Sequence, residues 1–282
     1  MCAFFTTTAQ EVATDDFSPA VTNKRGVLLL PGYGDFALGF DAMPFLNWFG
    51  NRNSDFDAFN GVNHSIYGKY FLGDDRAIRG RLTINMSNTS RVAAVRNDFE
   101  FTNNPLNALA TALDAMNTSS FNIDLGAGYE LRRGKGRVQG FYGGEVILGF
   151  GSGTKQTMEY GNPMTEVNQN PTHTIFVPTG SSDPPPPGRV TEVNNGSKIT
   201  AGLGGFVGVE YFFAPQISIG GEFCLALRYT FTGQTERTIE SWNAAANNVQ
   251  TQTSRSGQWD ASDIAFGTAP NFGGRLFLMF HF

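Results

Sequence analysis

Eleven charged residues stand out because each lies at an alternate position in a segment of otherwise apolar residues. They are Asp41, Lys69, Arg79, Arg81, Asp124, Glu130, Glu145, Glu210, Glu222, Arg228 and Arg275, six acidic and five basic. Opposite charges that share one face of a sheet are expected to pair with one another once they leave water. A structural network of ion pairs is therefore the favoured interpretation, and a narrow ion path is the alternative.

Catalysis by a nucleophile needs a serine or cysteine beside a base, usually histidine. The three histidines are His64, His173 and His281, and they fall in parts of the chain that cannot all converge. His64 and a serine of a loop could form a nucleophile and base, so an enzyme that acts on lipid is kept as the third candidate function. The carboxylates Glu210 and Glu222 could form an acid/base pair, but as partners of the nearby arginines they need no such role. No catalytic residue is assigned.

Cofactor motifs are missing from the sequence. "GFGSGTK" and "GLGGFVG" are glycine-rich, yet a phosphate loop must open a helix, and these stretches lie in segments with strand alternation. Cys2 and Cys224 are far apart and neither belongs to a CxxC pair. The net charge is −5 and no Lys/Arg block could follow a phosphate backbone. We therefore expect no cofactor, no metal and no nucleic-acid partner.

Eight segments alternate with a period of two residues, the pattern of strands with two different faces. In each segment one face is uniformly apolar and the other carries the charges. The segments are 34–49, 65–73, 77–86, 121–131, 137–150, 199–213, 217–231 and 272–282. Charged residues make up only 16% of the chain, and no apolar run reaches the length of a membrane-spanning helix.

This alternation suits either a soluble sandwich or barrel, with its apolar faces inward, or a membrane barrel with its apolar faces toward lipid. The connections separate the two, because short and long ones alternate strictly. Those near 74–75, 132–137 and 214–216 are short, and those near 47–63, 87–117, 151–195 and 232–269 are long. The sequence thus predicts an all-β fold, an eight-stranded antiparallel up-and-down transmembrane β-barrel with four long extracellular loops and both termini periplasmic.

The chain divides into three predicted parts. Residues 1–10 read as a signal-peptide remnant, with an ordinary tail as the alternative, 11–30 as a periplasmic N-terminal segment, and 31–282 as the barrel domain. Among the loops, the prolines 184–187 predict a stiff exposed spacer. The spacing of Leu106, Leu109, Ala110, Leu113 and Met116 predicts a short amphipathic helix. The last long connection is predicted to be solvated.

Two features of the sequence carry a family resemblance. The final Phe280 and Phe282, with the aromatic residues that alternate before them, resemble the C-terminal signature that the barrel-assembly machinery reads in Gram-negative outer-membrane barrels. "GDFALGFDAMPFLNWFGN", "SIYGKYFLGDDRAIRGRLTIN" and "GVEYFFAPQISIGGEF" resemble small Bacteroidetes outer-membrane β-barrel proteins, the OmpA/OmpX-like group. The resemblance covers most of 26–282 outside the long loops.

The resemblance implies the outer membrane of a Gram-negative bacterium as the location. Its implied partners are outer-membrane lipid, the barrel-assembly machinery during insertion, and other outer-membrane proteins. The expected role is non-enzymatic: a structural or interaction protein, either an accessory subunit of a larger outer-membrane complex or a barrel whose loops bind an extracellular ligand. A small pore or solute channel is the alternative.

Overall fold

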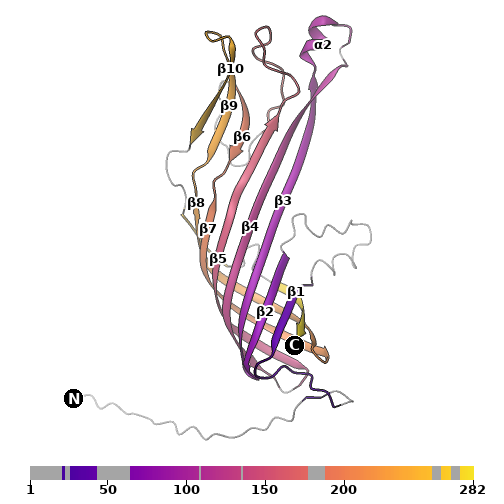
Figure 1. Ribbon diagram of the computed structural model, residues 1–282, viewed down its shortest axis with the longest axis vertical. Helices are drawn as coiled ribbons and strands as arrows, with labels where there is room; N and C mark the ends of the chain where they lie inside the picture. Colours follow the sequence, from indigo (N-terminus) through magenta and orange to yellow (C-terminus); the bar gives the residue numbers. More distant parts are fainter. Residues whose placement is uncertain are drawn as a thin grey trace, which may run out of the picture.

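The computed structural model describes residues 21–22, 26–42, 64–107, 109–134, 136–176, 188–255, 262–267 and 274–282. They form one antiparallel sheet of twelve strands, with a single short helix in the described part of the chain (Figure 1). Within these ranges no helix is long and apolar enough to cross a membrane. The predicted signal-peptide remnant at 1–10, Cys2 and the prolines 184–187 lie outside the described residues.

Eight of the strands pair in a closed circuit, called the ring below, in which β12 meets β1 and every pairing is antiparallel. In circuit order these strands are β1 (Phe36–Asp41), β2 (His64–Gly73), β3 (Arg76–Arg96), β4 (Thr111–Arg133), β5 (Val138–Glu159), β7 (Lys198–Ala214), β8 (Ile217–Thr232) and β12 (Gly274–His281). Within the ring, each of these strands is therefore paired on both sides.

Side chains of the ring alternate between an exposed face and a buried one, as expected for strands whose neighbouring side chains point to opposite faces. On the outside, Leu125 is 45% exposed and Leu225 42% exposed. On the inside, Glu145 is 4% exposed, and the hydrophobic cluster there includes Phe141 and Phe277. The apolar faces therefore point outward and the charged face points inward.

Three ring strands continue well beyond the ring and carry a second body of structure, called the head: the described residues within 88–119, 154–176, 189–194 and 236–255 (Figure 1). Besides the ends of β3, β4 and β5, the head contains β6 (Arg189–Asn194), β9 (Glu236–Asn243), β10 (Asn248–Arg255) and helix α2 (Asp98–Asn103). A separate strand, β11 (Ser262–Gly267), pairs with β8. The sheet thus has twelve strands where eight were predicted.

Most of the predicted long loops are strands instead. β3 runs to Arg96, β4 starts at Thr111 and β5 continues to Glu159, so the predicted loops at 87–117 and 151–195 are wrong over much of their length. The predicted solvated connection 232–269 contains β9, β10 and β11. These polar stretches carry no long apolar alternation, but their backbones pair with neighbouring strands, and that pairing stabilises them as strands.

The helix predicted from residues 106–116 is also wrong. The chain pairs as a strand from Thr111, and Leu113 is 62% exposed whereas Met116 is 4% exposed, which is strand periodicity. The short helix lies earlier, at 98–103, where the Asn97 side chain accepts a hydrogen bond from the Glu100 backbone N–H. An N-cap residue of this kind satisfies one of the free donors at a helix start.

A β-bulge interrupts the period-two alternation of β5 shortly after Phe150, so residues of the same parity face inward before the bulge and outward after it. The register between β4 and β5 shifts between Ser120 and Asn122, opposite Gly153. Gly153 has φ +70°, and a Cβ there would overlap the Gly196 carbonyl, so only glycine fits without strain. After the shift Met158 pairs with Met116, and both are buried in the core of the head.

Candidate functional site

The centre of the buried charge is a four-residue cluster inside the ring. The ammonium Nζ of Lys69 lies 3.0 Å from Oε1 of Glu130 and 3.3 Å from Oε2 of Glu210. Arg132 Nη1 lies 2.8 Å from an oxygen of each of the same two carboxylates. All four side chains are exposed by 4% or less. Two cations and two carboxylates therefore neutralise one another out of water.

A second cluster lies beside the first. Arg79 donates two hydrogen bonds to Glu222, at 2.8 and 3.1 Å, a bidentate pair. Arg275 Nη1 lies 3.3 Å from the same carboxylate, and Arg81 Nη2 lies 2.7 Å from Glu145. Arg79 also lies 3.8 Å from both Glu145 and Glu130, which joins the two clusters into one network.

The structure brings ten of the predicted charged residues into ion pairs with one another, the last pair being Arg228 with Asp124 at 2.9 Å. The remaining residue, Asp41, also has a polar or electrostatic contact, and it is half-buried at the end of β1, opposite Phe277 of β12. Of the two residues predicted as an assembly signal, Phe280 is partly buried and packs 6.0 Å from the Phe40 ring, and Phe282 is 69% exposed.

Two network residues were not predicted. Arg132 was taken as part of the turn "RRGKGR", but β4 runs through Arg133, so Arg132 shares the inward face of Glu130. His281 lies 3.3 Å from Oε1 of Glu210 and is 3% exposed. Extending the period-two count of segment 121–131 by one residue would have found Arg132. His281 already lies inside segment 272–282 on the face of Arg275, but it was considered only as a catalytic base.

Aromatic rings fill the space around the charges. Lys69 Nζ lies 4.6 Å from the ring centroid of Phe141 and 5.3 Å from that of Phe277, and the guanidinium carbon of Arg79 lies 3.9 Å from that of Phe206. Desolvated cations over ring faces are stabilised by the ring quadrupole. Glycines make room for the rings: a Cβ at Gly208 would overlap Phe141, and one at Gly220 would overlap Phe277.

A serine, a histidine and an acid meet in this network. Ser218 Oγ donates to Glu210 at 2.5 Å and lies 2.9 Å from Nε2 of His281. In a catalytic triad the acid holds the ring nitrogen opposite the one that faces the serine, whereas here Ser218 and Glu210 meet the same nitrogen. All three side chains are at most 3% exposed. Nδ1 of His281, the nitrogen that the acid would hold in a triad, is buried and has no hydrogen-bond partner among the described residues.

The other candidates for chemistry do not assemble. His64 begins β2, and His173 stacks edge-on against Tyr160 in the head, with ring centroids 5.5 Å apart. The glycine-rich stretches lie within β5 and β7, so neither opens a helix. Across the described ranges, no group of three or more His, Cys, Asp or Glu side chains is placed to hold a metal ion. Cys224 is buried inside the ring.

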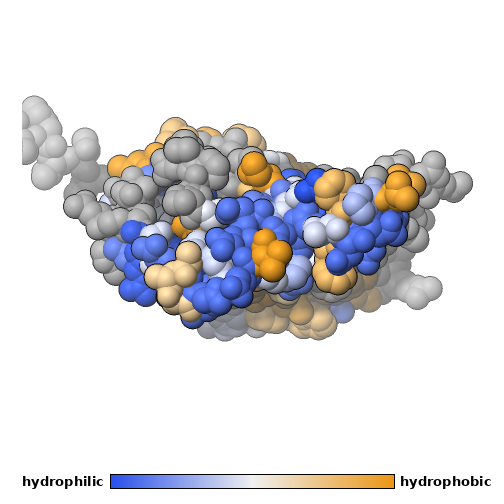
Figure 2. All heavy atoms as spheres, turned by 90° about the horizontal axis from the view of Figure 1, so that it is seen from above, coloured by the Kyte–Doolittle hydropathy of each residue, from blue (hydrophilic) through white to orange (hydrophobic). Residues whose placement is uncertain are grey.

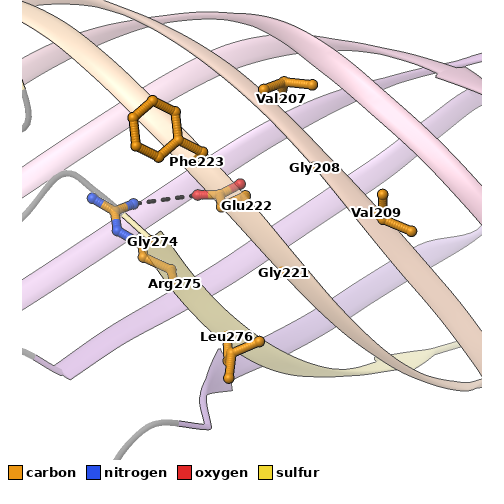
Figure 3. Close-up of a pocket in the computed structure, with 9 residues that line it drawn as sticks. All are labelled: Val207, Gly208, Val209, Gly221, Glu222, Phe223, Gly274, Arg275 and Leu276. Atoms are coloured by element: carbon orange, nitrogen blue, oxygen red, sulfur yellow. Dashed lines mark hydrogen bonds and ion pairs between the residues drawn. The ribbon is translucent and has the colours of Figure 1, made fainter.

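A shallow groove of about 580 Å³ lies on the ring wall where β7, β8 and β12 meet (Figure 3). Val207, Val209, Phe223 and Leu276 line it, and the close-up shows Glu222 and Arg275 joined by their hydrogen bond at its centre. Arg275 is 8% exposed and Glu222 4% exposed, so this opening barely reaches the network.

The head is held together by a second set of polar contacts around segment 160–176. Asp98 accepts hydrogen bonds from the backbone N–H of Thr172 at 2.6 Å and from the side chain of Asn168 at 2.9 Å. Burial raises the pKa of Asp98, but these hydrogen bonds and those from Arg96 outweigh it and lower the pKa to about 2. Asp98 therefore stays ionised and ties this segment to the helix.

Two further acceptors fasten the same segment. Asp114, fully buried, accepts the backbone N–H of Gly161 at 2.9 Å and that of Thr174 at 2.6 Å. Tyr160 donates its hydroxyl to the Val190 carbonyl at 2.6 Å, and burial raises the pKa of this phenol to about 12. A long connection is thus bonded at both ends to the sheet of the head.

The sequence matches no known protein-family model and no curated protein. Among solved structures, the fold is similar to that of a major outer membrane protein from Thermus thermophilus, at a TM-score of 0.39 and 13% identity, over 88% of this chain and 98% of that one. The chain's own residues and contacts are therefore the basis for a function.

Proposed function

We propose that this chain is an eight-stranded β-barrel of a Gram-negative outer membrane, closed to ions, with a structural or interaction role that the head performs outside the membrane. The observation that carries the proposal is the inverted arrangement of the ring. Apolar side chains cover its outside, and paired charges fill its inside. Water-soluble proteins do the opposite, because burying ionised groups is costly and exposing a continuous apolar wall to water is unfavourable.

The outer wall has the dimensions and borders of a membrane-spanning barrel. Aromatic side chains mark both borders of the exposed face. Toward the short turns these are Phe36, Tyr70, Tyr129, Tyr142, Tyr211 and Phe213, and toward the head they are Phe121, Phe150 and Phe231. Along β4, Tyr129 and Phe121 are eight residues apart, about 27 Å along the strand at about 3.4 Å per residue, or about 20 Å of height for a strand tilted by about 40°. Aromatic girdles on both sides of an apolar band are typical of outer-membrane barrels.

The filled interior supports a barrel that does not conduct. The side chains of the two linked clusters are exposed by 8% or less, and that of Arg228 by 14%, so water hardly reaches them. Eight strands leave an interior that side chains can fill, and here ion pairs and aromatic rings fill it. A conducting barrel would need a continuous wet path along the same axis.

The head supports an interaction role. It extends far from the short-turn end of the ring (Figure 1), and its surface seen from above is mainly hydrophilic with a few scattered hydrophobic side chains (Figure 2). The contacts of Asp98, Asp114 and Tyr160 give it a defined shape. A rigid projection on a closed barrel suits binding to another envelope protein or to an extracellular ligand, as an accessory subunit would.

Reconstitution tests the proposal. The full chain, folded into liposomes, should float with lipid in a density gradient and migrate differently on SDS gels before and after boiling. In planar bilayers it should give no discrete current steps, whereas the triple variant Arg79→Ala/Glu222→Ala/Arg275→Ala, which empties part of the interior, is the positive control for leak. Steady single-channel currents from the unchanged protein would replace the closed barrel by a small pore.

A further inference from the structure

The head sheet has two edges whose backbones are unpaired within the described part of the chain. Its strand order is β10-β9-β6-β5-β4-β3. β2 pairs with β3 only as far as His64 opposite Ile84, and from Asn88 to Arg96 the described partner of β3 is β4 alone. At the other end, β10 pairs with β9 alone among the described strands. Figure 1 shows β3 and β10 on opposite sides of the head.

The two edges cover the same span of the sheet. The pairing from strand to strand connects Asn88 to Ser119, Lys155, Asn194, Glu236 and finally Arg255. One free edge therefore runs from Asn88 to Arg96. The other begins in register with Asn88, at Arg255, and covers the residues back to Asn248. Their lengths, nine and eight residues, match to within one residue.

The directions of the two edges are complementary as well. β3 runs away from the ring, and each of the five pairings between β3 and β10 is antiparallel, so β10 runs back toward the ring. Two copies inserted in one membrane have the same orientation. The β10 edge of one copy is then antiparallel to the β3 edge of its neighbour. Joining them would continue the alternation of the head sheet from one copy into the next.

The two edges carry few of the devices that usually prevent such pairing. Natural edge strands are blocked by charged side chains, above all lysine, by proline, by bulges or by a covering element. The charged side chains here are Arg91 and Arg96 on β3 and Arg255 on β10. The register of β3 with β4 is unbroken, and neither the free part of β3 nor β10 contains proline or lysine. Every residue of β10 is exposed, and Val92 of β3 is 62% exposed.

We propose that copies of this chain associate head to tail in the membrane, with β10 of one copy added as a strand to the β3 edge of the next. This inference rests on the proposed barrel function, because the membrane supplies the common orientation. The contact is heterologous, so it forms rings or open rows of copies, unlike a two-fold dimer. Backbone hydrogen bonds supply the attraction, as in other cases of strand addition.

Cysteine cross-linking tests the pairing. When Asn88 faces Arg255 of the neighbour, Val92 faces Thr251, and both are exposed positions where cysteine should not disturb folding. Two singly substituted chains with different tags, V92C and T251C, are co-expressed with Cys2 replaced by serine and the buried Cys224 retained. Oxidation, or a short bismaleimide that tolerates a two-residue offset, should link V92C to T251C only. A chain that carries both substitutions should give a ladder of linked copies.

The outcomes separate the two levels of inference. Linked V92C pairs or linked T251C pairs would show like edges meeting and overturn head-to-tail association. The same holds for linkage of V92C to S241C, a control on β9, in preference to T251C. Absence of any link in chains that float with membranes and are heat-modifiable overturns the association and leaves the barrel standing. Chains missing from the membrane fraction overturn the proposed function itself.

Discussion

Arg132 Nη1 and Glu210 Oε2 lie 2.8 Å apart inside the ring, although 78 positions separate the two residues in the chain. Glu210 also accepts from Lys69 and Ser218 and lies beside His281, so this one carboxylate joins strands β2, β4, β7, β8 and β12. A group with this many buried partners is a sensitive place to probe the network.

Substitution Glu210→Gln should destabilise the folded chain by about 3–5 kcal/mol, because Lys69 and Arg132 are left with one buried carboxylate between them. Urea unfolding in liposomes, followed by tryptophan fluorescence, measures this change. The matched control is Glu192→Gln on the exposed pair with Lys155, whose side chains are 41% and 51% exposed. That variant should differ by less than about 1 kcal/mol. Equal effects would show that the interior pairs carry no special weight.

The glycines that face interior rings should tolerate no side chain. A Cβ at Gly220 would overlap the Phe277 ring, and Gly220→Ala should destabilise by about 1–3 kcal/mol through overpacking. A Cβ at Gly80 would have no atom within 4 Å, so Gly80→Ala should change the free energy of unfolding by less than about 0.5 kcal/mol. The double variant G220A/F277L, which removes the clash, should recover part of the lost stability in the same unfolding assay.

A single charged substitution on the outer wall of the ring tests whether that wall faces lipid or water. Leu225 is 42% exposed in the middle of β8, and in lipid Leu225→Arg should destabilise by about 2–4 kcal/mol. Val92 is 62% exposed in the head, and Val92→Arg should be nearly neutral. The folded fraction on unboiled gels after insertion into liposomes reports both. If L225R were as stable as V92R, the outer wall would not face hydrocarbon.

Protonation of Asp98 at acid pH should weaken its hydrogen bonds to segment 160–176 of the head. The pKa of this carboxyl in the folded chain is about 2, below its usual value of 3.8, so its contribution is complete above about pH 4 and disappears as the pH falls toward 2. The protection factors of the amides in segment 160–176, which compare the observed exchange with the intrinsic rate at each pH, should fall over that range. D98N should exchange rapidly already at neutral pH, whereas E166Q, an exposed position in the same segment, should behave like the parent. Exchange that is insensitive to D98N would assign the order of this segment to other contacts.

The orientation of the ring strands could be read from the sequence. In β8 one face carries large apolar side chains from Ile217 to Phe231, and the other carries all the charged ones, Glu222 and Arg228, among small residues. The structure has the same two faces. Alternation is a local property of the sequence. A strand with one apolar face and one charged face has few packing arrangements that suit both faces. For this reason ten of the charged residues found in ion pairs were identifiable before the fold was known.

The head, by contrast, was decided by tertiary structure. Its strands are polar, with stretches such as "NVQTQTSR", and their hydrogen-bond partners lie far away in the chain, as when β6 pairs with β9. The bulge at Gly153 reverses the faces of β5, and Arg132 enters the network because its strand runs past the apparent turn. Side-chain alternation within one segment determined which side chains share the exposed wall and which share the buried interior. Where each strand ends and which strand lies beside it depends on backbone hydrogen bonds between distant segments, and only the folded chain shows those.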